Sequence, residues 1–355
     1  MSTKNYYRQI IIVLLLIFLG GNQLYAFIPA TTYFNSGIAF LPTKATPKTS
    51  ATPVLLKSKQ TTTNSSENIA KYKKKSTKFV AMDTYFAITV YTTTTLDKKV
   101  FAKCIKRVQE IEKWGNSFDP QSQLSQINKS AHQDNVPINA DLFKILKYAQ
   151  QMGQDTNGAF DITVQPLIDF YKQSKNQKTI PKVPQSLLKE VNYQNIILDP
   201  KIKTVRLKNQ AQITLGGILK GYAIDEIVTI LKEHKIQKAL INGGGNIYVL
   251  GTNEENKPWL IGIKNPHQTT QVIRTVELVD QGISTSAGYE RYTHQDGKKY
   301  SHILNPKTGM PVLAYGSVTV IAPTAIQADV LSTAIYVDNT LQNNFPDLQT
   351  YIYRK

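Results

Sequence analysis

At residues 213–225 the sequence reads Ile213-Thr214-Leu215-Gly216-Gly217-Ile218-Leu219-Lys220-Gly221-Tyr222-Ala223-Ile224-Asp225. Apolar residues alternate before the two glycines, which is typical of a strand. After the glycines they recur every three or four residues and continue with Ile227 and Leu231, which is typical of a helix. The stretch therefore predicts a strand, a double-glycine turn and a helix that runs to about His234.

The start of this helix is suited to a phosphate group. Free backbone N–H groups and the positive end of the helix dipole would face the ligand, and Lys220 would add a mobile charge. The spacing is neither that of a P-loop nor that of the GxGxxG dinucleotide fingerprint. From spacing alone, glycines that only allow tight packing between strand and helix are the alternative.

Strands and helices alternate irregularly outward from this stretch. Strands are predicted at 79–91, 238–250 (interrupted by Gly243-Gly244-Gly245), 259–263 and 317–321, a hairpin at 196–207, and helices at 97–113, 140–152 and after Thr324. Regular βαβ spacing is absent, so the pattern predicts an α+β fold with mixed, largely antiparallel sheets packed against helices.

The N-terminal part has a different composition. Residues 1–26 predict a signal peptide or an uncleaved signal anchor, because a charged start precedes the apolar run Ile10–Leu19 and a possible cleavage site at Leu24-Tyr25-Ala26. Residues 27–77, rich in Thr, Ser, Lys and Pro, predict a disordered basic linker, and residues 78–355 the folded domain. We therefore expect an exported protein, periplasmic or anchored at the outer face of the cytoplasmic membrane.

The formal net charge is +17. Much of it comes from lysines in the linker, where Glu67 is the only acid, and no predicted helix carries an arginine stripe. This distribution favours the anionic inner-membrane surface as a partner and argues against nucleic acid. The single Cys104 excludes an internal disulfide.

Two short motifs near the C-terminus contain groups that could carry chemistry. His302 precedes an Asn-Pro-Lys-Thr-Gly turn, and Asp329 and Thr333 share one face of a predicted helix, where they could supply two oxygens to Mg²⁺. Taken alone, His302 could equally be a hydrogen-bonded structural histidine, and Asp329 a solvated charge on a helix. The other histidines lack metal-ligand spacing, which argues against a zinc site.

Taken together, eight segments in order resemble the ApbE family, the FAD:protein FMN transferases, also described as thiamine-biosynthesis lipoproteins. They are Met82-Asp83-Thr84, 118–128, 158–164, 215–225, 242–247, 285–290, 302–309 and 328–334. The resemblance runs from about Lys78 to about Asp338 and implies an ApbE-like fold with a ligand cleft between two lobes.

The resemblance also implies roles for particular residues. It implies that His302 is required for transfer, and that Mg²⁺ is held by the Gly217 carbonyl and the side chains of Asp329 and Thr333. The residues expected to bind FAD are Met82, Phe118, Ala159, Phe160, Asp161, Thr214, Lys220, Thr285 and Ser286. The activity implied is transfer of FMN from FAD to a Thr or Ser hydroxyl of a partner redox protein, with release of AMP. The acceptor would typically be a membrane respiratory subunit.

Three positions depart from the family pattern. The family commonly has Asp where Thr214 stands, Asp where Asn305 stands, and Gly where Ala287 stands. Asn305 retains the turn chemistry but removes a charge. Two alternative functions stay open: a pyrophosphatase that splits FAD into FMN and AMP, and an exported FAD-binding protein without turnover, for which Thr214 is the main argument.

Overall fold

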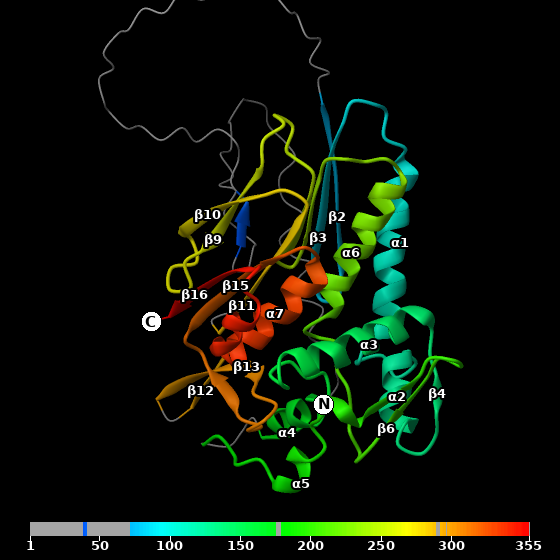
Figure 1. Ribbon diagram of the computed structural model, residues 1–355, viewed down its shortest axis with the longest axis vertical. Coiled ribbons are helices and arrows are strands. Elements are labelled where there is room, and N and C mark those ends of the chain that lie inside the picture. The colour runs from blue at the N-terminus through cyan, green and yellow to red at the C-terminus, as the bar shows by residue number, and fades with distance from the viewer. Residues whose placement is uncertain (1–37, 41–71, 175–178, 289–291, 296, 355) are drawn as a thin grey trace, which may run out of the picture. The chain divides into compact units, whose positions relative to one another are not determined.

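The computed structural model describes residues 38–40, 72–174, 179–288, 292–295 and 297–354 (Figure 1). The predicted signal at 1–26 and most of the predicted linker lie outside these residues. Within them, no helix is both long and apolar enough to cross a bilayer.

The largest sheet of the described chain has seven antiparallel strands in the order β16-β15-β11-β8-β7-β3-β2. These strands are β2 (Lys73–Ala81), β3 (Thr84–Thr92), β7 (Ala239–Gly243), β8 (Asn246–Leu250), β11 (Gln281–Ala287), β15 (Gly316–Ala322) and β16 (Gln349–Arg354). Strands β3 and β7 are neighbours in this sheet although they are far apart in the sequence, and Phe86 of β3 pairs with Gly243 of β7.

Three smaller sheets accompany it. They are β1-β9-β10, with β1 (Ile38–Phe40), β9 (Trp259–Lys264) and β10 (Val272–Leu278); β12-β13-β14, with β12 (Tyr292–Gln295), β13 (Lys298–Leu304) and β14 (Pro311–Leu313); and β4-β6-β5, with β4 (Val136–Pro137), β5 (Ile196–Asp199) and β6 (Thr204–Leu207). The mixture of helices with antiparallel sheets confirms the predicted α+β class.

Alternating side chains divide the core between the two faces of the large sheet. On β7, Ala239 and Ile241 face the larger core, which also contains residues of the helices, whereas Leu240 faces a second core shared with β9 and β10. The helices are α1 (Lys98–Gly115), α2 (Gln123–Ser130), α3 (Ala140–Asp155), α4 (Gln165–Gln173), α5 (Gln185–Leu188), α6 (Leu219–Glu233) and α7 (Ala325–Val337), with 3₁₀ turns at Tyr193–Asn195 and Asn339–Asn344. The sheet is therefore buried on both faces over its central strands.

The structure corrects the predicted single strand at 79–91. Met82 and Asp83 have φ angles of 52° and 55°, and this left-handed turn folds the stretch into the β2–β3 hairpin. β2 begins at Lys73 rather than Lys78, because an exposed edge strand is held by backbone pairing to β3 and needs no apolar pattern. Residues 213–215 form no strand, although the Thr214 amide donates to the Ile162 carbonyl at 2.8 Å.

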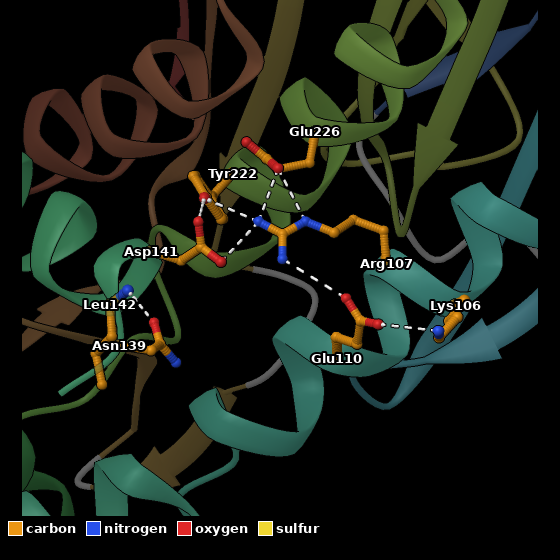
Figure 2. Close-up of polar contacts among 8 residues, drawn as sticks. All are labelled: Lys106, Arg107, Glu110, Asn139, Asp141, Leu142, Tyr222 and Glu226. Atoms are coloured by element: carbon orange, nitrogen blue, oxygen red, sulfur yellow. Dashed lines mark hydrogen bonds and ion pairs between the residues drawn. The ribbon is translucent and has the colours of Figure 1, made fainter.

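A half-buried ion cluster joins α1, α3 and α6 (Figure 2). The Arg107 guanidinium donates to the carboxylates of Asp141 at 2.8 Å and Glu226 at 2.8–2.9 Å, and the Tyr222 hydroxyl donates to Asp141 at 2.9 Å. Each carboxylate favours the charged guanidinium, so the pKa of Arg107 is raised although burial opposes the shift. These contacts fix α6, whose first turn opens the candidate site, against α1 and α3.

Candidate active site

The first turn of α6 contains the double-glycine motif. Its N-terminal position, Ile218, offers no side-chain cap, and the Gly216 amide donates to the Thr214 hydroxyl at a long 3.4 Å. Lys220 Nζ lies 3.5 Å from the Gly216 carbonyl oxygen, so its charge is held over this turn. The predicted phosphate-friendly arrangement of glycines, helix start and lysine is thus formed.

Helix α7 meets this turn through Asp329 and Thr333. The Asp329 side chain is 5% exposed and its Oδ2 accepts from the Gly221 amide at 3.0 Å. Thr333 Oγ1 lies 3.8 Å from the position that a Cβ on Gly217 would take. The three positions predicted to hold a cation, Gly217, Asp329 and Thr333, therefore lie together although they come from two distant segments.

Asp329 is an unusual carboxylate because no arginine or lysine forms an ion pair with it among the described residues. Burial raises the pKa of Asp329, while Lys220, Asn246 and the Gly221 amide oppose that shift. The side chain of Asn246, whose Oδ1 accepts from the Ser284 hydroxyl at 2.8 Å, also interacts with this carboxylate. A cation beside Asp329 would supply the missing positive charge.

The oxygens available here fit a hard divalent cation. The described residues hold no group of three or more His, Cys, Asp or Glu side chains placed for a metal. One carboxylate with a neutral hydroxyl and a backbone carbonyl is instead the mixed oxygen set that Mg²⁺ accepts, with positions left for phosphate oxygens and water. The residues present thus fit the implied Mg²⁺.

The segment after α3 places Phe160 against the same turn. A Cβ on Gly217 would lie 3.2 Å from Phe160 Cε2, so the ring packs directly on the double glycine. The turn is held by Thr156, whose hydroxyl accepts from the Phe160 amide at 3.1 Å. Ala159 and Phe160 are buried at 3% and 4% exposure.

Asp161 is committed to structural hydrogen bonds. Its Oδ1 accepts from the amide and hydroxyl of Thr163 at 2.8 and 2.6 Å, and its Oδ2 accepts from the Tyr193 amide at 2.8 Å. Burial raises the pKa of Asp161, and these three hydrogen bonds oppose the shift. The carboxylate therefore shapes the loop that carries Ala159 and Phe160.

The remaining predicted residues lie in different surroundings. Ser286 Oγ is 3.3 Å from Thr333 Oγ1, whereas the Thr285 side chain lies on the opposite face of β11, 2.7 Å from Thr319 Oγ1. Met82 forms the half-buried tip of the β2–β3 hairpin, where its amide donates to Glu112 at 2.6 Å. The structure thus brings the Ser286 side chain beside Thr333 of α7, whereas the Thr285 side chain does not lie there.

Phe118 lies in the loop after α1 and is 74% exposed. Lys172 Nζ is 5.3 Å from the ring centroid, and both side chains line an open pocket of about 340 Å³ with Lys129, Gln165 and Asp169. No described contact joins Phe118 to Asp329 or Thr333.

His302 is an exposed residue of β13, between the buried Ser301 and Ile303. The turn that follows is closed by Asn305, whose side-chain oxygen accepts from the amides of Lys307 at 2.9 Å and Thr308 at 3.2 Å. Lys307 Cε lies 3.8 Å from a Cβ position on Gly158, so the turn reaches the loop of Ala159 and Phe160. The predicted turn chemistry of Asn305 is confirmed.

A sequence model described as the ApbE family matches residues 82–343. The chain belongs to the ApbE family. Within that family it is 33% identical over 240 residues to the FAD:protein FMN transferase of Haemophilus influenzae, an alignment covering 62% of this chain and 67% of the relative. It is 31% identical to that of Klebsiella pneumoniae, covering 61% and 68%.

Solved structures of ApbE proteins share the fold. The ApbE protein of Thermotoga maritima aligns with a TM-score of 0.70 at 29% identity, covering 80% of this chain and 97% of that one. The Pseudomonas stutzeri flavinyl transferase ApbE also gives 0.70, at 22% identity, covering 80% and 92%. The predicted family resemblance is thus confirmed, while the cleft between two lobes stays a prediction.

Sequence reasoning missed the role of Asp225, which lies on α6 and caps α7. Its two carboxylate oxygens accept from the amides of Ala325 at 2.8 Å and Ile326 at 2.9 Å. Since Asp329 of α7 accepts from Gly221 of α6, each helix supplies a carboxylate to the first turn of the other. The four-residue spacing of Gly221 and Asp225 is compatible with this reciprocal cap, but only the tertiary contact reveals it.

We expect the stability of the protein to fall between about pH 4 and pH 6 because of Asp225. Burial raises its pKa from the ordinary 3.8 to about 6; the Ile326 and Ala325 amides and Lys144 oppose the shift, and Glu226 adds to it. Tyr148 and Tyr248 also face this carboxylate. The folded state therefore binds more protons than the unfolded state in this window, and the free energy of unfolding drops by about 2–3 kcal/mol as the pH rises.

Urea unfolding at pH 4, 5, 6 and 7 measures this effect. In the natural protein the free energy of unfolding should differ between pH 4 and pH 6, and Asp225→Asn should reduce this difference by about 2 kcal/mol. The control Asp134→Asn, at an exposed position, should give the same pH profile as the natural protein. Parallel profiles for Asp225→Asn and the natural protein would contradict the assignment.

Proposed function

We propose that this protein transfers FMN from FAD to a hydroxyl group of an acceptor protein and releases AMP. The observation that carries the proposal is the meeting of Gly217, Asp329 and Thr333 beside the Phe160 ring, in a chain of the ApbE family. Relatives named FAD:protein FMN transferase at 33% and 31% identity support the reaction.

The reaction makes one bond and breaks one. The acceptor hydroxyl oxygen attacks the phosphorus on the FMN side of FAD, the P–O bond to the AMP half breaks, and AMP leaves with the electron pair. The hydroxyl proton must be removed during attack, and a neutral histidine is suited to accept it near pH 7. We assign this role to His302, whose exposed position on β13 leaves it accessible to a protein acceptor.

Other groups of the chain bind and orient FAD. Lys220 and the α6 amides would hold pyrophosphate oxygens, and Phe160 would pack beside them. Met82, Phe118, Ala159, Asp161, Thr214, Thr285 and Ser286 complete the proposed FAD set, Asp161 by shaping its loop and Thr285 through its backbone. Mg²⁺, held by the Gly217 carbonyl, Asp329 and Thr333, would neutralise charge that develops on the phosphate oxygens.

The finer parts of the proposal concern acceptor and location. We propose a threonine or serine of a membrane respiratory redox subunit as acceptor, with the enzyme exported and working at the outer face of the cytoplasmic membrane. The apolar run Ile10–Leu19 and the lysine-rich segment that follows support this location. The protein family supports a protein acceptor in general terms.

The test incubates the purified protein with FAD, Mg²⁺ and a tagged acceptor domain that carries one target threonine. Mass spectrometry of the acceptor and release of AMP are followed together. We expect stoichiometric FMN addition and AMP release, both abolished by EDTA and by changing the target threonine to alanine. AMP with no acceptor modification would indicate a pyrophosphatase, and FAD retention without AMP would indicate a binding protein; either result would refute transfer.

A further inference from the structure

Exposed lysines gather at one end of the described domain, where α1 begins and α6 ends. This surface, named the lysine end, comprises Lys73, Lys74 and Lys75 of β2, Lys98, Lys99 and Lys103 of α1, and Lys232 and Lys235 at the end of α6. In Figure 1 the start of β2, the start of α1 and the end of α6 all lie at the top of the view.

Contacts between residues also place these segments together. Lys73 pairs with Thr92 at the end of β3, and Asp97 begins α1 shortly after that strand. Lys103 Nζ lies 3.1 Å from Nε2 of His234, the residue that ends α6. The three groups of lysines therefore share one end of the fold.

The local charge balance at this end is strongly positive. Within residues 73–75, 97–103 and 232–235, the acids are Asp97, whose side chain caps α1 by accepting from the Lys99 amide, and the exposed Glu233. Glu254 and Glu255 lie on the neighbouring loop, where Glu255 pairs with Lys257. Among the described residues, the lysine end forms no ion pair.

The placement of these lysines opposes local stability. Lys98 and Lys99 occupy the first turn of α1, which contains no acidic residue, although the positive end of a helix dipole disfavours cations there. Lys73, Lys74 and Lys75 are consecutive like charges on the exposed edge strand β2. An external anionic surface would remove both penalties.

We propose that the lysine end docks on an anionic lipid bilayer. Several exposed ammonium groups at one end of a domain suit a plane of lipid phosphates, since each lysine near such a surface adds to binding without needing a shaped pocket. The apolar run Ile10–Leu19 precedes Tyr72 and β2 in the sequence, and β2 begins at the lysine end. A bilayer is therefore favoured over nucleic acid, for which the end offers no arginine.

Docking in this orientation would set the height of the candidate site. Helix α1 starts at the lysine end and finishes at Gly115, which packs on Leu219 in the first turn of α6. Its 18 residues span about 27 Å. The Gly217–Asp329–Thr333 group would thus stand about 25 Å from the headgroups, facing acceptors whose hydroxyl is at that height; this last point rests on the proposed function.

The test uses the full chain and vesicles of phosphatidylcholine alone or mixed with phosphatidylglycerol. Two triple variants, Lys73/Lys74/Lys75→Gln and Lys98/Lys99/Lys235→Gln, are compared with the control Lys189/Lys201/Lys208→Gln, which removes the same charge from exposed sites elsewhere. All proteins retain residues 1–71, so any binding through that segment is common to them. We expect each lysine-end variant to bind the phosphatidylglycerol vesicles about a hundredfold more weakly, and the control within about twofold of the natural protein.

A second readout reports orientation. A fluorophore on Ala102→Cys, at an exposed position between Lys99 and Lys103, should be quenched by a lipid-borne quencher, and the buried Cys104 should stay unlabelled. Equal loss of binding in control and lysine-end variants, an unquenched probe, or tighter binding to duplex DNA than to vesicles would overturn the proposal. FMN transfer to a soluble acceptor should be unchanged in the variants. Absence of transfer in every protein would refute the proposed function while leaving docking to be judged by the vesicle data.

Discussion

His302→Ala is expected to reduce FMN transfer by about 10²–10⁴-fold, the range that a general base contributes. The side chain is exposed on β13 between the buried Ser301 and Ile303. Single-turnover transfer with excess enzyme measures the chemical step, and FAD binding measured by fluorescence should change little. The control is His267→Ala, which also removes an exposed imidazole.

The pH dependence separates a base from a residue that only orients the phosphate. If His302 is the base, the rate of transfer should rise with pH as the imidazole loses its proton. His302→Ala should lose this rise, and its rate should increase with the concentration of a buffer base that is not itself a nucleophile. An unaltered pH profile at reduced rate would assign His302 to orientation. Full transfer by His302→Ala would refute its requirement.

Asp329→Asn is expected to separate activity from stability. Asparagine can still accept from the Gly221 amide, so the cap on α6 is retained. The only carboxylate of the proposed cation site is lost, and transfer should fall by about 10²-fold or more because several kcal/mol of charge stabilisation disappear. Without added cation the variant should be more stable than the natural protein by about 1 kcal/mol, since an unpaired buried charge is removed.

Thermal unfolding with and without Mg²⁺ checks both parts. Mg²⁺ should raise the melting temperature of the natural protein and of Asp347→Asn, at an exposed position, but not that of Asp329→Asn. A variant that keeps Mg²⁺ stabilisation and transfer would remove Asp329 from the cation site. A variant that is destabilised without cation would show that its charge is already compensated by the protein.

Local patterns in the sequence were sufficient for much of the fold. The apolar spacing of residues 97–113 and 140–152 predicted α1 and α3, and a helix was expected after Thr324, whose hydroxyl accepts from the Gln327 amide at 3.3 Å at the start of α7. Each of these features depends on residues within a few positions of one another. Helix periodicity and capping are local, so they can be seen without knowing the tertiary structure.

Other features depend on contacts between distant segments and could not be predicted from local patterns. The reciprocal cap joins Asp225 to Ala325, and nothing within α6 shows which amides its carboxylate will meet. The two faces of β11 separate Thr285 from Ser286, yet that assignment required knowing that α7 covers one face. The Met82-Asp83 turn was hidden because both residues adopt left-handed backbone angles without a glycine.

The pairing of β3 with β7 has a consequence for how the chain acquires its fold. Phe86 meets Gly243 only after the whole intervening segment, including helices α1 to α6, has been brought into place. Contacts of such large sequence separation carry a high loop-closure entropy and slow the rate-limiting step of folding. A nascent chain that ends before β7 has no partner for β3 on that side. The large sheet, and with it the two cores on its faces, can therefore be completed only after β16, near the C-terminus, has been synthesised.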